Sequence, residues 1–317
     1  CLKHFAVNNQ ETYRNGIDVQ ISYSLLRGRY LRAFEQVVKA AHPWTIMSSY
    51  NKINGIYASE NTYLLTDVLR GEWGFDGFVM TDWWAEEDPI RMQQAGNDML
   101  MPGTQMQIDT LIAAVQDGRL DEAVLDRNLL RVLRIIRRTP AFLHPSELSP
   151  KNEDLSSMLS SHAALAREAA AKGMVLLKNT NTLPLTNSQL SFALFGKGAY
   201  DTYAGGTGSG RVTRAYTVSI AEGLINAGYT IDASLKSSYC EHIRISREAQ
   251  PRETAWYMPY ISELQFATTD IDRLAKANDM ALITLQRMAG EGGDRHLAEG
   301  DYYLTSVEKE LIKKVSK

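Results

Sequence analysis

The chain has 317 residues, 44% of them apolar, with a formal net charge of -3 at pH 7. This is enough for one large domain or two medium ones, and the charge disfavours nucleic acid as a partner. The two cysteines, Cys1 and Cys240, exclude a disulfide framework and show no zinc-like spacing.

The first residues, Cys1 to Val7, read as the end of a buried strand, with no methionine and no polar run before them. We therefore expect a fragment that begins inside a domain. No apolar run approaches eighteen residues, which predicts no membrane span, and no charged-then-apolar leader opens the chain. Compartment stays open between the cytoplasm and an extracytoplasmic (periplasmic or secreted) location, because any leader would lie upstream.

Residues 1–138 alternate strand and helix, which is typical of a parallel sheet. We expect a helix through Leu31 and Val38, and another, capped by Ser59, through Leu64 and Leu69. The remaining expected elements are the strands Thr45–Tyr50, Gly77–Thr81 and Asn97–Met101 and the helices Met106–Gln116 and Asp121–Arg138. Four strands joined by helices predict the C-terminal half of a (β/α)8 TIM-type barrel.

Residues 139–160 contain several prolines among polar residues at their start and are predicted to be a linker. Residues 161–317 again alternate strands and helices, which predicts a second α/β domain. The expected elements are the helices 161–172, 218–227 and 271–278, the strands 174–177, 190–195 and 279–285, and an irregular span at 239–260.

One apolar run ends abruptly in an acid and two indoles: Asp76 to Trp84 reads DGFVMTDWW. The ends of parallel strands form the rim at which ligands bind, so Asp82 is the first catalytic candidate. Trp83 and Trp84 offer an apolar wall on which the carbon face of a sugar can lie. The alternative is that Asp82 caps the next helix.

Two glycine-rich segments, Gly205–Gly210 and Gly290–Arg295, match neither a P-loop nor the dinucleotide fingerprint. Their glycines allow the backbone to lie close to a ligand, on loops that follow strands. Glu291 is a lone carboxylate in the second loop, just after a predicted strand. Acids at strand ends therefore occur in both predicted domains.

Together these residues resemble a glycoside hydrolase family 3 β-glucosidase over nearly the whole chain. The matching elements are Lys3-His4-Phe5 with Asn8-Asn9-Gln10-Glu11, Met47-Ser48-Ser49-Tyr50-Asn51, Thr81-Asp82-Trp83, Val175-Leu176-Leu177-Lys178-Asn179, Gly205 to Gly210, and Gly290-Glu291-Gly292 with Asp294-Arg295. The resemblance implies a (β/α)8 barrel followed by an α/β sandwich, with a site between them. Here both domains are expected to be partial.

By the same resemblance, Asp82 is the nucleophile and Glu291 the acid/base of a retaining hydrolase that releases glucose from the non-reducing ends of β-glucosides. It also implies that sugar is bound by Lys3, His4, Arg14, Met47, Tyr50, Trp83 and Ser209. The expected substrates are β-linked oligosaccharides or aryl and alkyl glucosides. Two carboxyl groups and water suffice, so no cofactor or metal is expected. We further hypothesise that Lys3 and Arg14 keep Asp82 ionised while desolvation keeps Glu291 protonated.

Three alternatives remain: a β-xylosidase on the same scaffold, an N-acetyl-β-glucosaminidase of the family, and a non-catalytic carbohydrate-binding remnant. The Lys-His-Phe motif continues as Ala6-Val7-Asn8-Asn9-Gln10 and lacks the Pro-Gly that N-acetyl-β-glucosaminidases of the family tend to carry there. The family's substrate-binding aspartate and a further arginine would precede Lys3. The 317 residues alone are therefore expected to be poorly folded or inactive, because half a barrel has open sheet edges.

Overall fold

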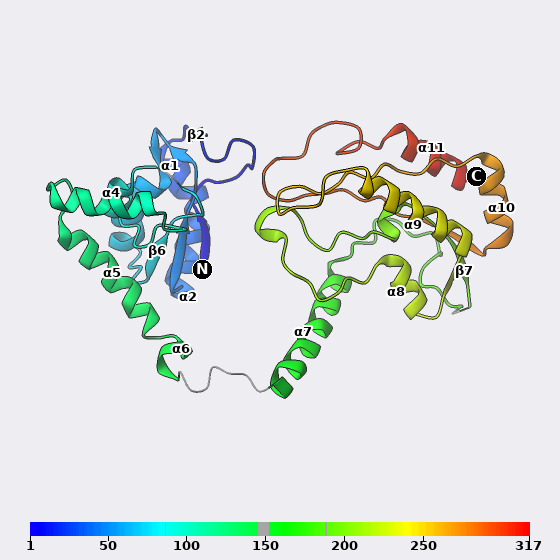
Figure 1. Ribbon diagram of the computed structural model, residues 1–317, viewed down its shortest axis with the longest axis horizontal. Coiled ribbons are helices and arrows are strands. Elements are labelled where there is room, and N and C mark those ends of the chain that lie inside the picture. Colours follow the sequence, from blue (N-terminus) through cyan, green and yellow to red (C-terminus); the bar gives the residue numbers. More distant parts are fainter. Residues whose placement is uncertain (86, 145–151, 188) are drawn as a thin grey trace. The chain divides into compact units, whose positions relative to one another are not determined.

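The computed structural model describes residues 1–85, 87–144, 152–187 and 189–317 (Figure 1). It consists of two compact units, Cys1–Val175 and Leu176–Lys317. Both combine helices with parallel strands, which confirms the predicted α/β class. Within the described residues, no helix has the length and apolar character needed to cross a membrane.

The first unit is built on a parallel sheet in the order β1 (Leu2–Phe5), β3 (Thr45–Ser48) and β6 (Phe78–Met80). A further parallel bridge joins Met80 to Met99. The first three predicted strands of this unit are thus confirmed, the strand predicted at Asn97–Met101 is reduced to the bridge at Met99, and spatial order follows chain order. The carboxyl ends of these strands consequently meet at one edge of the sheet.

Helical segments connect these strands, and their apolar side chains form the core with the sheet. Phe5, Ile46 and Val79 from the strands belong to one buried cluster with Val38, Leu65 and Leu69 from the helices. The segments are α1 (Tyr23–Leu25), η1 (Leu26–Tyr30), α2 (Arg32–Ala41), η2 (Ala58–Glu60), η3 (Tyr63–Glu72), α3 (Pro89–Ala95), α4 (Gln105–Gln116) and α5 (Glu122–Ile136).

Two local features of this unit differ from expectation. A small second sheet, β2 (Asp18–Val19), β4 (Lys52–Ile53) and β5 (Ile56–Tyr57), was not predicted, because strands of two residues are too short to show a period. The prediction that Ser59 caps the following helix was wrong. Ser59 is buried in η2, and it is Asn61 whose Oδ1 accepts a hydrogen bond from Leu64 N at 3.0 Å.

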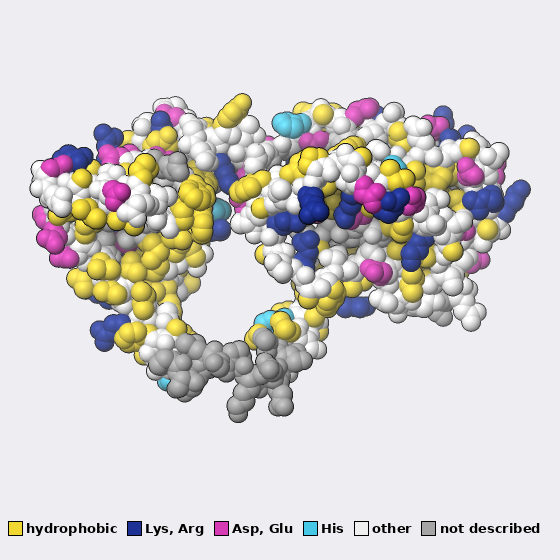
Figure 2. All heavy atoms as spheres, viewed as in Figure 1, with side chains coloured by type: hydrophobic (Ala, Val, Ile, Leu, Met, Phe, Trp, Pro, Cys, Tyr) yellow, Lys and Arg dark blue, Asp and Glu magenta, His cyan; other side chains and the backbone are white. Residues whose placement is uncertain are grey.

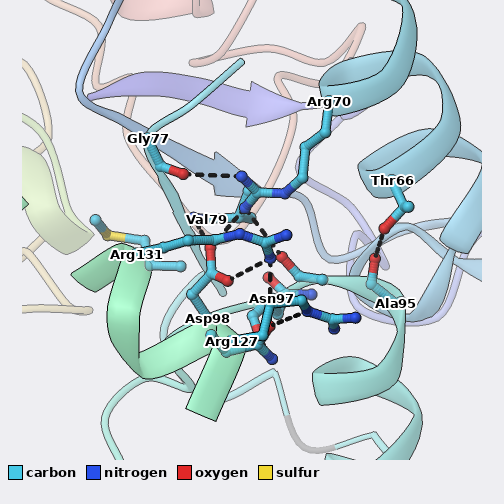
Figure 3. A network of polar contacts seen from close by, with 12 residues as sticks. Thr66, Arg70, Gly77, Val79, Ala95, Asn97, Asp98, Arg127 and Arg131 are labelled. Carbon is cyan, nitrogen blue, oxygen red and sulfur yellow. Dashed lines mark hydrogen bonds and ion pairs between the residues drawn. The ribbon is translucent and has the colours of Figure 1, made fainter. Parts of the chain in front are cut away.

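A buried carboxylate ties the helices of this unit to its sheet (Figure 3). Asp98 accepts hydrogen bonds from Arg70 at 2.6 Å, from Arg131 at 3.0 Å and from the backbone N–H of Val79 at 2.7 Å. Arg70 also donates to the carbonyl of Gly77, just before β6. Burial lowers the pKa of Arg70 to about 10, so its guanidinium keeps its charge at neutral pH.

The predicted linker is only partly irregular. Pro140–Leu143 forms the short helix α6, residues 145–151 lie outside the described residues, and α7 runs from Asn152 to Gly173, starting well before the expected Ser161. The strand expected at residues 174–177 was not found. Its apolar side chains are 63–92% exposed, and no other described strand pairs with it. Apolar content alone did not make a strand here because pairing was lacking.

The second unit holds a parallel sheet in the order β8 (Thr230–Ile231), β7 (Ser191–Phe195) and β9 (Met280–Ile283). The strands predicted at 190–195 and 279–285 are thereby confirmed. Its core joins Phe195 of β7 with Tyr239, Leu274 and Leu311 from the helices. These helices and turns are η5 (Lys197–Ala199), η6 (Gly208–Gly210), α8 (Ile220–Asn226), α9 (Ala233–Glu248), α10 (Thr268–Ala277) and α11 (Ser306–Val315).

Helix α9 corrects the prediction that the span 239–260 is irregular throughout, since it continues to Glu248. Charged side chains of both signs lie along it in Figure 2. Arg244 pairs with Glu241 at 2.6 Å and with Glu248 at 2.7 Å, at helical spacing. The whole helix went unrecognised, although Leu235, Tyr239 and Ile243 recur at helical spacing and are buried.

Candidate active site

Asp82 follows β6 at the carboxyl edge of the first sheet, where its side chain is only 12% exposed. Its Oδ2 lies 3.5 Å from Nε2 of His4 on β1, and its Oδ1 accepts a hydrogen bond from Trp83 N at 2.8 Å. The next helix, α3, is capped instead by Asp88, which accepts from Ile90 N. The alternative that Asp82 is a helix cap is therefore wrong.

The turn after Asp82 is held by several contacts. The Tyr50 hydroxyl donates a short hydrogen bond to the carbonyl of Trp83, and Trp84 N donates to Met101 O at 3.1 Å. Trp83 and Trp84 are 50% and 55% exposed and meet edge to face, with 6.3 Å between ring centroids. Two half-exposed indoles beside a shielded carboxylate form a surface suited to the apolar face of a sugar.

The other predicted site residues of the first unit differ in how directly they contact Asp82. The Arg14 guanidinium stands 4.8 Å above the Tyr50 ring and pairs with Glu11 at 2.9 Å. Lys3 is exposed on β1 and Met47 is half-buried on β3. Contacts thus link His4, Asp82, Trp83, Tyr50 and Arg14 in series, whereas no hydrogen bond or ion pair within the described ranges joins Lys3 to Asp82.

In the second unit, Glu291 lies against the other glycine-rich loop. Its Oε1 accepts a hydrogen bond from Ser209 N at 2.9 Å and a short one from the Ser209 hydroxyl. Gly208 has a φ of +70°, and a Cβ there would lie 2.5 Å from the Cβ of Glu291. The two glycine-rich segments predicted to approach a ligand therefore also approach each other, which brings two predicted site residues together.

Sequence reasoning missed several neighbours of Glu291. Thr207 Oγ1 donates to Glu291 O at 2.8 Å, and Gly208 N donates to Ala255 O at 2.7 Å. The latter bond places the span around Trp256 beside the loop, with the indole 61% exposed. The aromatic residues Trp256, Tyr257 and Tyr260 in an irregular span were a signal that could have been used. In the described ranges no group of three or more His, Cys, Asp or Glu side chains could hold a metal ion.

Two family models match the chain. Residues 1–135 match the Glycosyl hydrolase family 3 N terminal domain, and residues 174–317 match the Glycosyl hydrolase family 3 C-terminal domain. The chain belongs to glycosyl hydrolase family 3. The resemblance inferred from six motifs is thereby confirmed.

Several curated proteins are similar to this chain. The thermostable β-glucosidase B of Acetivibrio thermocellus is 41% identical over 230 residues, which are 72% of this chain and 29% of the relative. An exo-α-(1→6)-L-arabinopyranosidase of Bifidobacterium longum is 38% identical over 240 residues, 73% of this chain and 31% of the relative.

Among solved structures, β-glucosidase 3B of Thermotoga neapolitana in complex with glucose superposes with a TM-score of 0.90 at 42% identity. The match covers 100% of this chain and 44% of that protein. This family 3 chain thus spans less than half of the length of these relatives.

Proposed function

We propose that the chain is part of a retaining β-glucosidase that releases glucose from the non-reducing ends of β-glucosides by double displacement. The observation that carries the proposal is the position of Asp82 in a family 3 chain: at the carboxyl end of β6, largely shielded, and in contact with His4. The β-glucosidases among the relatives support glucose as the sugar.

In the proposed first step, the carboxylate of Asp82 attacks the anomeric carbon and the glycosidic bond to the leaving oxygen breaks. The carboxylate is held in place by the hydrogen bond from Trp83 N to Oδ1 and by the nearby His4. Its other oxygen, Oδ2, faces His4. Trp83 would lie against the sugar ring. His4, Lys3 and Arg14 would bind its hydroxyls, and Met47 and Tyr50 would line the site.

Glu291 is the proposed acid/base. It would protonate the leaving oxygen in the first step and remove a proton from water in the second. Retention requires the two carboxyl groups to come within about 5 to 5.5 Å of each other around the sugar. Ser209 donates to Oε1 of Glu291 and thereby orients the carboxyl group that would exchange the proton.

We further propose that residues 1–138 are the C-terminal half of a (β/α)8 barrel, 139–160 a linker, and 161–317 part of an α/β sandwich. Three parallel strands in chain order, followed by the bridge at Met99, support the first assignment. The order β8-β7-β9 with flanking helices supports the third. Activity is proposed for the full-length protein, because half a barrel leaves edges unpaired.

A second candidate is an exo-acting α-L-arabinopyranosidase. The relative from Bifidobacterium longum with that activity in its name is nearly as similar to this chain as the β-glucosidases are. The two candidates differ in the sugar released, and a panel of aryl glycosides decides between them.

The test uses full-length protein, a panel of aryl glycosides, and the variants Asp82→Asn, Glu291→Ala and Asp88→Asn. Asp82→Asn is expected to abolish turnover by several orders of magnitude, whereas Asp88→Asn, which keeps a helix cap, retains it. Glu291→Ala should lose turnover mainly on substrates with poor leaving groups, and azide should restore part of it. Full activity of Asp82→Asn would refute the proposal.

A further inference from the structure

The segments that leave β7 and β9 run side by side as far as Glu291. At Gly196 a Cβ would collide with Thr284. At Gly198 it would lie 2.8 Å from the Cβ of Gln286. Further along, the same close approach joins Gly206 to Ala289, Gly208 to Glu291, and Gly290 to Thr207. The contact between the two strands is thus continued by their loops, and glycine supplies the space on one side at each step.

Side chains fix the alignment of these two loops. Near the strands, Gln286 donates from Nε2 to Asp201 O at 3.0 Å and accepts from Tyr203 N at 3.2 Å. Next to Glu291, Thr207 likewise joins the two loops. Its Oγ1 donates to Glu291 O at 2.8 Å, and its carbonyl accepts from Glu291 N at 3.4 Å. Thr207 therefore holds the backbone of Glu291 on both sides of the residue.

We propose that Thr207 is a positioning residue that sets where the carboxyl group of Glu291 stands. This rests on the proposed function, in which Glu291 is the acid/base. A proton donor works only within hydrogen-bond reach of the leaving oxygen, and a displacement of about 1 Å can cost 100-fold in rate. Thr207 does not itself touch the carboxylate in the described contacts; it acts through the backbone that carries it.

Thr207 also governs the two bonds from Ser209. Ser209 lies two residues further along the same loop, and its N–H and hydroxyl both donate to Oε1 of Glu291. These bonds form only if the loops keep their alignment. Loss of the Thr207 hydroxyl removes its hydrogen bond to Glu291 O, so the backbone loses a direct constraint and the carboxyl group an indirect one.

The experiment compares Thr207→Val, Thr207→Ala and Thr207→Ser in the full-length protein. Kcat/KM is measured for aryl glucosides with activated and with poor leaving groups. Valine has nearly the shape of threonine without its hydroxyl, alanine relieves any crowding by the second methyl, and serine restores the hydroxyl. Thr202→Val is the matched control, because the Thr202 hydroxyl donates to Gly198 O at 2.7 Å in the same loop, away from Glu291.

Thr207→Val and Thr207→Ala are expected to lose about 10- to 100-fold in kcat/KM on poor leaving groups and much less on activated ones. Thr207→Ser should stay near the parent, and Thr202→Val should not change the dependence on leaving group. Equal losses on all substrates, or no loss in either variant, would overturn the proposal. Thermal unfolding of each variant identifies any that does not fold. If Thr207→Val or Thr207→Ala fails to fold, the other variant tests the proposal.

Glu291→Ala, measured in parallel, separates the two proposals. If its losses do not depend on the leaving group, the acid/base assignment itself fails. If they do, and those of the Thr207 variants do not, only the positioning role of Thr207 fails.

Discussion

His4 Nε2 lies 3.5 Å from Asp82 Oδ2 because β1 and β6 flank β3 in one parallel sheet. His4→Asn shortens the side chain and removes this contact. We expect a loss of about 10- to 100-fold in kcat/KM on aryl glucosides, comparable to the loss of one polar contact with a charged group. His42→Asn is the control, since His42 ends α2 in a left-handed conformation that asparagine tolerates. Equal losses in both variants would contradict the role given to His4.

The Asp98 network predicts a large effect on stability. Asp98→Ala would leave the partly buried guanidinium groups of Arg70 and Arg131 without their carboxylate, at a cost of about 3 to 5 kcal/mol in the free energy of unfolding. Urea denaturation of the full-length protein measures it. The exposed Asp109→Asn on α4 should change the free energy by less than about 0.5 kcal/mol. A loss at Asp98 as small as that at Asp109 would show that the network stabilises little.

Gly208→Ala should impair activity with little effect on folding elsewhere. The added Cβ has no room beside Glu291, and the φ of +70° disfavours any side chain. We expect the loss of kcat/KM to be largest for poor leaving groups, because the displaced group is the proposed proton donor. Gly223→Ala is the control: it lies in α8 with open space around its Cβ and should leave activity intact. Activity of Gly208→Ala equal to that of the parent would refute the prediction.

The pairing of Arg287 with Glu308 predicts a pH-dependent stability. Burial works to raise the pKa of Glu308, but hydrogen bonds from Arg287 and Thr305 outweigh it and hold the pKa below its ordinary value of 4.5. The native state therefore favours ionised Glu308. Its contribution to stability is present above pH 4.5 and is lost as the pH falls through the lowered pKa.

Glu308→Gln should thus lower the free energy of unfolding by about 2 kcal/mol at pH 7, and the gap to the parent should close on acidification below about pH 4.5. Urea denaturation at a series of pH values measures both. Glu310→Gln removes an exposed carboxylate from the same helix and is the control. A gap that widens in acid would contradict the sign of the shift.

Much of the fold followed from local pattern. Apolar runs predicted β3, β6, β7 and β9 because buried parallel strands are continuously apolar. The position of Asp82 was predicted because an acid that ends such a run must lie at the rim of the sheet. Ser59 was wrongly made a cap because serine and Asn61 are both good caps, and only the end of η2 at Glu60 decides between them.

The environment of Glu291 could not be predicted in the same way. The glycines of both loops indicated close approach, but not that each loop approaches the other. Thr207 and Glu291 are far apart in sequence, and a threonine among glycines does not indicate which residue it contacts. Only the pairing of β7 with β9 brings them together, and long-range pairing of this kind is invisible to local periodicity.

The segments that leave β7 and β9 contact each other along their length, and this restricts where the length of this family 3 chain can vary. An insertion or deletion between Gly206 and Gly208, or between Ala289 and Glu291, would shift one loop relative to the other. The carboxyl group of Glu291 would then lose its hydrogen bonds from Ser209. Homologues should instead accumulate length differences after Arg211, where η6 has ended. Grafting one of these loops from a relative should succeed only when its counterpart is transferred with it.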